Sequence, residues 1–124
     1  MYPPIFQIVS SNQAVTTLLK KDGIVRFFQF GRAPQGVEYP YAVWQIVSGV
    51  PENYLGDVPI IDSFVVQVDV YATTEASARD VAKALRGALE KRAYITRWGG
   101  ESIDDNTQMR RISFDVSFYT DRES

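Results

Sequence analysis

Apolar side chains alternate with other side chains most regularly between Asp62 and Thr73. A period of two is typical of a β-strand that buries one of its faces. The expected core face carries Phe64, Val66, Val68, Val70 and Ala72, and the opposite face carries Val65, Gln67, Asp69 and Tyr71. This segment has the clearest strand signal in the chain.

The period becomes that of a helix directly after this strand, from about Glu75 to Arg92. The apolar side of the predicted helix carries Ala78, Val81, Ala82, Leu85 and Leu89. Thr74 is the expected N-cap. Glu75 lies near the positive start of the helix and Arg92 near its negative end, and both charges suit the helix dipole.

The amino-terminal third of the chain contains a second helical pattern. Between Pro3 and Lys20 the apolar residues recur at spacings of three and four, which fits a helix that can break near Ser10 to Asn12. Asp22 and Gly23 predict a turn into a β-rich segment from Ile24 to Phe30. Gly31 to Pro40 has no regular periodicity, contains two Gly and two Pro, and is expected to be a surface loop.

The remaining elements are expected to be strands and their connections. Tyr41 to Val50 is apolar on both sides, as in a strand packed on two faces, and Pro51 to Pro59 suits an extended loop or hairpin tip. Ala93 to Trp98 reads as a strand, Gly99-Gly100 as a bend or bulge, and Ser102 to Gln108 as a polar turn. In a last strand, Met109 to Tyr119, one side carries Ile112, Phe114, Val116 and Phe118, and the other carries Arg111, Ser113, Asp115, Ser117 and Tyr119.

This order of elements predicts an α+β fold. Consecutive hairpin-like strands favour a mainly antiparallel or mixed sheet of about four or five strands, with two helices packed on one face as a two-layer sandwich. The 124 residues are expected to form one domain, residues 1–124, without an internal repeat or linker.

The composition excludes more classes of catalytic and metal-binding site than any motif does. The chain contains no Cys and no His, which excludes thiol nucleophiles, cysteine metal sites and most hydrolase and zinc mechanisms. The net charge of −2 does not indicate binding to nucleic acid or to an anionic membrane, which a large positive charge would favour. Neither a signal peptide nor the roughly 20 apolar residues of a membrane-spanning helix is apparent, so we expect a soluble protein that is not secreted.

Two acidic residues are the strongest candidates for chemistry. Asp69 and Asp115 share the outward phase of two strands that can be neighbours, and two close carboxylates can act as acid and base or bind a divalent cation. Outward strand positions usually carry polar residues, however, so a solvated or lumen-facing surface is the favoured interpretation. We expect no catalytic residue, cofactor, metal or small-molecule substrate.

Three other motifs have simpler explanations. Asp104-Asp105-Asn106 lacks the later Gly and Glu of a calcium loop, and Gly31 to Gly36 lacks the Lys-Ser or Lys-Thr ending of a phosphate loop. Arg110 and Arg111 cannot form one flat nucleic-acid patch, because neighbouring strand residues point to opposite sides.

Aromatic residues are more numerous than one small core accommodates. They include Tyr39, Tyr41, Trp44, Tyr54 and Trp98. Tyr and Trp are favoured in protein interfaces because they are large, rigid and able to hydrogen-bond at one end. We therefore expect some of these aromatic residues in the core and the others in an interface.

The order of these segments resembles a family of phage tail-completion proteins. The resemblance is carried by Gly31 to Gly36, the run Tyr39-Pro40-Tyr41-Ala42-Val43-Trp44-Gln45, the run Pro51-Glu52-Asn53-Tyr54-Leu55-Gly56 and the segment Val66 to Ala72. It continues through the helix that contains Leu85 and Leu89, to Ser113-Phe114-Asp115-Val116. Such proteins are similar to the tail terminators of long-tailed phages, which close the tail tube with a ring, commonly of six subunits.

The resemblance implies a structural protein of the virion tail, assembled in the bacterial host cytoplasm, without an enzymatic activity. Its expected partners are copies of itself, the tail tube protein and a head-completion protein, with DNA only passing through the ring and no membrane. We expect Tyr39, Tyr41, Tyr54 and Leu55 in interfaces and Asp69 and Asp115 facing a lumen. A head-completion or connector protein and a monomeric protein-binding adaptor are the alternatives.

Overall fold

The computed structural model describes residues 5–51, 61–103 and 108–121. Within these ranges the helices are α1 (Ile5–Ser10), α2 (Gln13–Leu19) and α3 (Glu75–Leu89). The strands are β1 (Lys20–Lys21), β2 (Ile24–Val25), β3 (Phe27–Gln29), β4 (Tyr41–Pro51), β5 (Ile61–Ala72), β6 (Tyr94–Ile103) and β7 (Arg110–Asp121).

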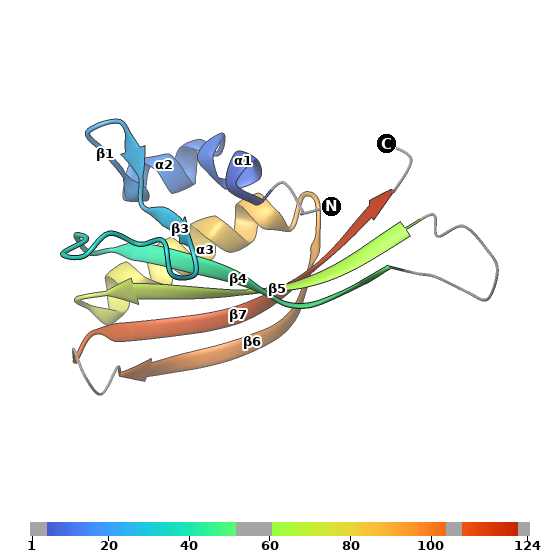
Figure 1. Cartoon of the computed structure of the whole chain (residues 1–124). Helices are drawn as coiled ribbons and strands as arrows, with labels where there is room; N and C mark the ends of the chain where they lie inside the picture. The colour runs from blue at the N-terminus through green and yellow to red at the C-terminus, as the bar shows by residue number, and fades with distance from the viewer. Residues whose placement is uncertain (1–4, 52–60, 104–107, 122–124) are drawn as a thin grey trace.

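Five strands form one sheet in the order β3-β4-β5-β7-β6, and β1 and β2 form a separate antiparallel pair. β3 is parallel to β4, whereas every other pairing in the large sheet is antiparallel. The helices lie on one face of this sheet, and the far ends of β4, β5 and β7 extend beyond them (Figure 1). The predicted two-layer α+β fold with a mixed sheet is therefore confirmed.

The sheet is covered by three helices, where the sequence predicted two. The amino-terminal helical segment divides at Ser11 and Asn12, because the Asn12 side chain accepts a hydrogen bond from the Val15 N–H at 3.1 Å and starts α2. Thr74 caps α3 in the same way, accepting from the Ser77 N–H at 3.1 Å, as predicted. α3 ends at Leu89, about one turn before the expected end at Arg92.

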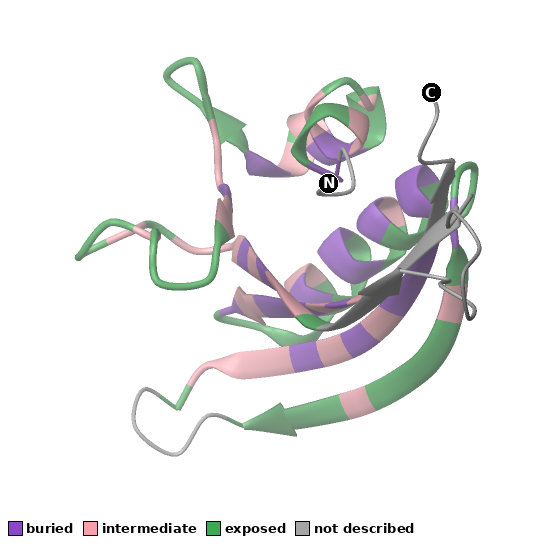
Figure 2. Cartoon of the chain, turned by 45° about the vertical axis from the view of Figure 1, so that its right-hand side comes forward, coloured by how far each residue is buried: buried purple, intermediate pink, exposed green. Residues whose placement is uncertain are grey.

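The core lies between the helices and the sheet. Alternate residues of β5 and β7 are buried there against the apolar side of α3, which gives the banded strands of Figure 2. Leu85, Leu89 and Phe114 are fully buried in this layer. Their burial accounts for the position of α3, because each such side chain stabilises the fold by about 1.5–3 kcal/mol relative to exposure.

Two rows of paired residues cross the entire sheet. One consists of Phe27, Ala42, Val70, Ile112 and Glu101, and the other of Gln29, Trp44, Val68, Phe114 and Trp98. We refer to the latter five residues as the central row. Its two ends lie on the two outer strands, β3 and β6, at the same level along the strands.

Irregular pairing interrupts both outer parts of the sheet. The register shifts between Ile46 and Ser48 of β4, and twice in β6, around Thr96 and between Trp98 and Glu101. The second β6 shift confirms the bulge predicted at Gly99-Gly100. A Cβ on Gly99 would come within 2.7 Å of the Ser113 carbonyl oxygen, so this position needs glycine.

Two expected boundaries were wrong. The β-rich segment Ile24 to Phe30 divides at Arg26, and its two halves join different sheets. β6 continues to Ile103, although Ser102 had been assigned to a polar turn, because Ser102 and Ile103 pair with Arg111 and Arg110. Tertiary pairing with β7 here outweighs local composition.

Candidate interaction surfaces

The face of the sheet that the helices leave uncovered holds both candidate acids. Asp69 lies opposite Ser113, and Asp115 lies opposite Gln67, so β5 and β7 are neighbours and the two acids are placed diagonally. We call the outward side chains of β4, β5, β6 and β7 the open face. The sequence correctly predicted that Asp69 and Asp115 share it.

Asp69 is 6% exposed, although it belongs to the open face. Its Oδ1 accepts a hydrogen bond from Arg111 Nη2 at 3.1 Å, and both carboxylate oxygens accept from Gln67 Nε2 at 3.2 and 3.3 Å. Burial of a carboxylate is tolerable when such donors surround it. The Asp69 carboxylate is therefore a buried, hydrogen-bonded part of the sheet surface.

Asp115 is held by a second arginine. Arg97 Nε and Nη2 donate to the two oxygens of Asp115 at 2.8 and 3.0 Å, and Nη2 also donates to Ser113 Oγ at 3.2 Å. The hydrogen bond to Asp115 raises the pKa of Arg97. Asp69 and Asp115 thus each have a guanidinium partner, and these four charges cancel.

This arrangement suits a structural surface better than acid-base or metal chemistry. The carboxylates are occupied by arginines, and their facing groups are Gln67 and Ser113. In the described ranges, no group of three or more acidic side chains is close enough to hold a metal ion. None of the helices described there is long and apolar enough to cross a membrane.

Three tyrosines lie together at one end of the open face. The ring centroids of Tyr39 and Tyr41 are 5.4 Å apart, and those of Tyr41 and Tyr71 are 5.2 Å apart with nearly parallel rings. We call these three residues the tyrosine cluster. Tyr39 and Tyr41 were predicted interface residues, whereas Tyr71 was not, although its outward phase on β5 was the available signal.

The other two proposed interface residues, Tyr54 and Leu55, lie outside the described residues. Their predicted role therefore stays a prediction.

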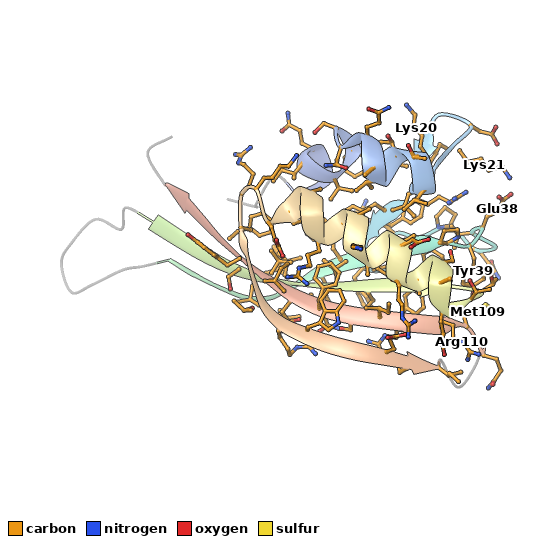
Figure 3. All side chains as sticks on the ribbon, turned by 180° about the vertical axis from the view of Figure 1, so that it is seen from behind. Lys20, Lys21, Glu38, Tyr39, Met109 and Arg110 are labelled. Carbon is orange, nitrogen blue, oxygen red and sulfur yellow. The ribbon has the colours of Figure 1, made fainter. Side chains whose placement is uncertain are left out.

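Ionic contacts fix the loop that leads to the tyrosine cluster. Lys21 Nζ lies 2.6 Å from Glu38 Oε2, while Arg26 donates to the carbonyl oxygens of Pro40 at 2.9 Å and Leu18 at 3.2 Å. The Lys21 hydrogen bond lowers the pKa of Glu38 and, in return, raises the pKa of Lys21. Lys21, Glu38 and Tyr39 lie at one end of the molecule together with Arg110 (Figure 3).

A groove of about 520 Å³ runs between α3 and β6. Its aromatic wall is Trp98, which is 46% exposed and stacks on Phe114 with ring centroids 5.3 Å apart. The Arg86 guanidinium lies 5.6 Å from the centre of the Trp98 ring. Arg79 and Glu101, joined by hydrogen bonds of 3.0 and 3.1 Å, form the polar rim. We call this space the tryptophan groove.

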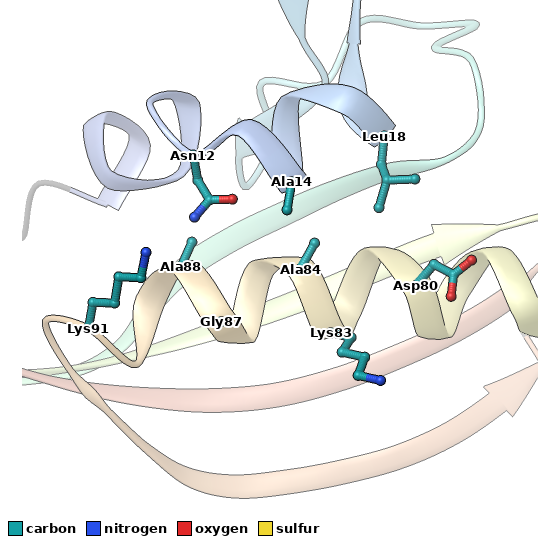
Figure 4. Close-up of a pocket in the computed structure, with 9 residues that line it drawn as sticks. All are labelled: Asn12, Ala14, Leu18, Asp80, Lys83, Ala84, Gly87, Ala88 and Lys91. Atoms are coloured by element: carbon teal, nitrogen blue, oxygen red, sulfur yellow. The ribbon is translucent and has the colours of Figure 1, made fainter.

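A second groove of about 480 Å³ lies between α2 and α3 (Figure 4). Its small side chains come from both helices, with Ala14 on α2 pointing toward Ala84 and Ala88 on α3, and Lys83 and Lys91 also line it. The side-chain oxygen Oδ1 of Asn12 at this groove already accepts the hydrogen bond that caps α2. These features provide no set of convergent polar groups that would orient a small polar ligand.

Residues 3–121 match the model of a family described as tail completion protein gp17. The chain belongs to this family. The tail-completion family consists of structural proteins of phages, so the chain is a structural protein of a phage tail. The expected family resemblance is thereby confirmed.

Two solved structures have the same fold as this tail-completion protein. A chain from the virion of a native gene transfer agent particle superposes with a TM-score of 0.61 at 16% identity, covering 94% of this chain and 91% of that one. The gp17 protein of bacteriophage SPP1 gives a TM-score of 0.59 at 14% identity, with coverages of 97% and 88%. No curated protein matches the sequence.

Proposed function

We propose that this tail-completion protein assembles into a ring, commonly of six copies, that closes the end of the tail tube and provides the surface for joining the head. The observation that carries the proposal is the family match, which spans residues 3–121. The surfaces agree with assembly: aromatic and arginine side chains, which are enriched in interfaces, remain accessible on the open face and along β6.

The tyrosine cluster supplies the axial contact with the tail tube protein or a head-completion protein. It lies at one end of the strands, and its rings can bury apolar area while their hydroxyls bond to a partner. Tyr54 and Leu55 belong to the same proposal. If Tyr39→Ala with Tyr41→Ala leaves head joining unchanged in a complementation assay, this assignment is wrong.

The open face lines the channel in this proposal, with Asp69 and Asp115 toward the lumen. The acids are balanced by Arg111 and Arg97, so passing DNA meets a polar wall without net charge from these four groups. Such a wall neither binds nor strongly repels a polyanion. Arg97→Gln should leave DNA ejection close to normal, whereas Asp115→Lys should retard it at low salt.

Deletion of the gene in its phage, followed by complementation, tests the function as a whole. The proposal expects uncapped tails of irregular length and free heads, with normal particles restored by the intact gene. Negative-stain images should show the purified protein as a ring at the tube end. Normal tails with defective head vertices would instead indicate a head-completion protein, and a persistent monomer bound to another protein would indicate an adaptor.

A further inference from the structure

Exposed apolar side chains lie beside one outer strand of the sheet, β3, and on the other outer strand, β6. Beside β3, Ile24 is 59% exposed and Phe30 is 66% exposed. On β6, Tyr94 is 68% and Ile103 is 51% exposed, on either side of Trp98. Single exposed apolar residues are ordinary, so their placement relative to one another must decide whether they have a role.

The central row gives that placement. Gln29 and Trp98 are its two ends, and Phe30 directly follows Gln29. In a closed ring, two unlike surfaces meet by rotation without a shift along the axis, so they must lie at the same level. If the ring axis runs along the strands, the edge that carries Phe30 in one copy and the edge that carries Trp98 in the next copy lie at the same level.

Backbone pairing between the two edges is unfavourable because both are irregular. β3 offers three residues, and β6 is distorted around Thr96 and at Gly99-Gly100. A bulge disrupts the ladder and twists the edge away from a new strand. The contact must therefore be made by side chains.

We propose that Phe30 of one copy inserts into the tryptophan groove of the next copy, against Trp98. The groove has the anatomy of an interface centre, with an aromatic wall and the Arg79–Glu101 ion pair at its rim. This inference rests on the proposed ring and names the surface through which its subunits join.

Both partners of the contact are held in position before association. The Phe30 N–H donates to the Trp44 carbonyl at 2.7 Å, and Gly31 follows with a φ of 83°, which fixes the turn. Trp98 is held by stacking on Phe114 and by Arg86. Prior ordering reduces the entropy that association costs, so one aromatic contact can contribute strongly.

A pair of matched substitutions tests the role of Phe30. Phe30 and Phe6 are both exposed, at 66% and 49%, and neither belongs to the buried core, so aspartate should be tolerated at each. Phe30→Asp should weaken association by about 30-fold or more, the scale of an interface hot spot. Phe6→Asp should leave it unchanged. Mass photometry over a concentration series provides the measurement.

Cysteine cross-linking tests the geometry directly. The chain has no native cysteine, so two single variants, Gln29→Cys and Thr96→Cys, carry one thiol each, both at exposed positions. Mixed together with a short thiol cross-linker, they should give a linked dimer. Its yield should exceed that of Gln13→Cys with Thr96→Cys by about tenfold, because a contact raises the effective thiol concentration.

The results separate this inference from the proposed ring. A ring by mass with no excess of the Gln29–Thr96 product, or with equal effects of Phe30→Asp and Phe6→Asp, overturns the inference and leaves the ring intact. A chain that stays monomeric at all concentrations, without the cross-link, contradicts both the inference and a ring formed by the free protein. Loss of the ring in Phe30→Asp together with the specific cross-link supports it.

Discussion

The two faces of the large sheet are built from the same strands but differ in chemistry, one being apolar and buried and the other carrying paired charges. On the helix-covered face, Val66, Val68 and Phe114 exclude water by packing against α3. On the open face, the residues between them include Asp69 and Asp115, each joined to an arginine. Stability is therefore concentrated on one face, whereas the other holds polar and aromatic groups in fixed positions.

The largest expected effect comes from the covered face. Phe114→Ala should lower the free energy of unfolding by about 3–5 kcal/mol, because it leaves a cavity under α3 and removes the support of Trp98. Its neighbour on the open face provides the control. Ser113→Ala should cost about 1 kcal/mol or less, the value of one hydrogen bond to Arg97. If urea denaturation shows equal losses of unfolding free energy for Phe114→Ala and Ser113→Ala, the two faces do not differ in their contribution to stability.

Asp69 should show the next largest effect, because its carboxylate is buried although it lies on the open face. Asp69→Ala leaves Arg111 without its acid and should cost about 1–3 kcal/mol. Asp115→Ala should cost less, because its side chain is 18% exposed and Arg97 can turn to solvent. A double-mutant cycle with Arg111→Ala measures the coupling; a value near zero would show that the pair is not structural.

Tyr41→Ala should affect stability moderately and partner binding more. Its ring contacts Tyr39 and Tyr71, and an aromatic pair contributes about 0.5–1.5 kcal/mol. Thermal melting gives the stability change, and head joining in a complementation assay gives the functional change. The control is a variant with a conservative core change and the same melting temperature as Tyr41→Ala. If this control loses as much head joining as Tyr41→Ala does, Tyr41 has no contact role.

The smallest effect is expected at Lys21 and Glu38, which are exposed. The folded pKa of Glu38 is lowered from 4.5, so its contribution is present above that value and is lost as the pH falls through the folded pKa. The folded pKa of Lys21 is raised from 10.5, so its contribution is present below that value and is lost at higher pH. The melting temperatures of the wild type and Glu38→Gln should differ slightly between about pH 5 and 10 and converge outside this window. Salt should also reduce the difference.

Sequence reasoning succeeded where one-sided burial imposes a period. β5, β7 and α3 have one apolar side each, and Asp69 and Asp115 were placed on a common face before their partners were known. It could not identify Arg97 and Arg111 as those partners, because the pairing depends on register between strands far apart in the chain.

The errors have a common physical origin in tertiary contacts. Arg26 separates β2 from β3 because its guanidinium binds the carbonyls of Pro40 and Leu18, which no local pattern reveals. The parallel pairing of β3 with β4 and the length of β6 likewise depend on distant partners. The tryptophan groove was missed for the same reason, although Trp98 itself was singled out as a surplus aromatic.

The bulges in β4 and β6 have a consequence for the protein before assembly. Regular open strand edges would let copies of a chain pair edge to edge and grow into fibres. The glycine pair of β6 and the extra residue of β4 make such templated growth unfavourable. Both irregularities therefore disfavour edge-to-edge aggregation of the free chain.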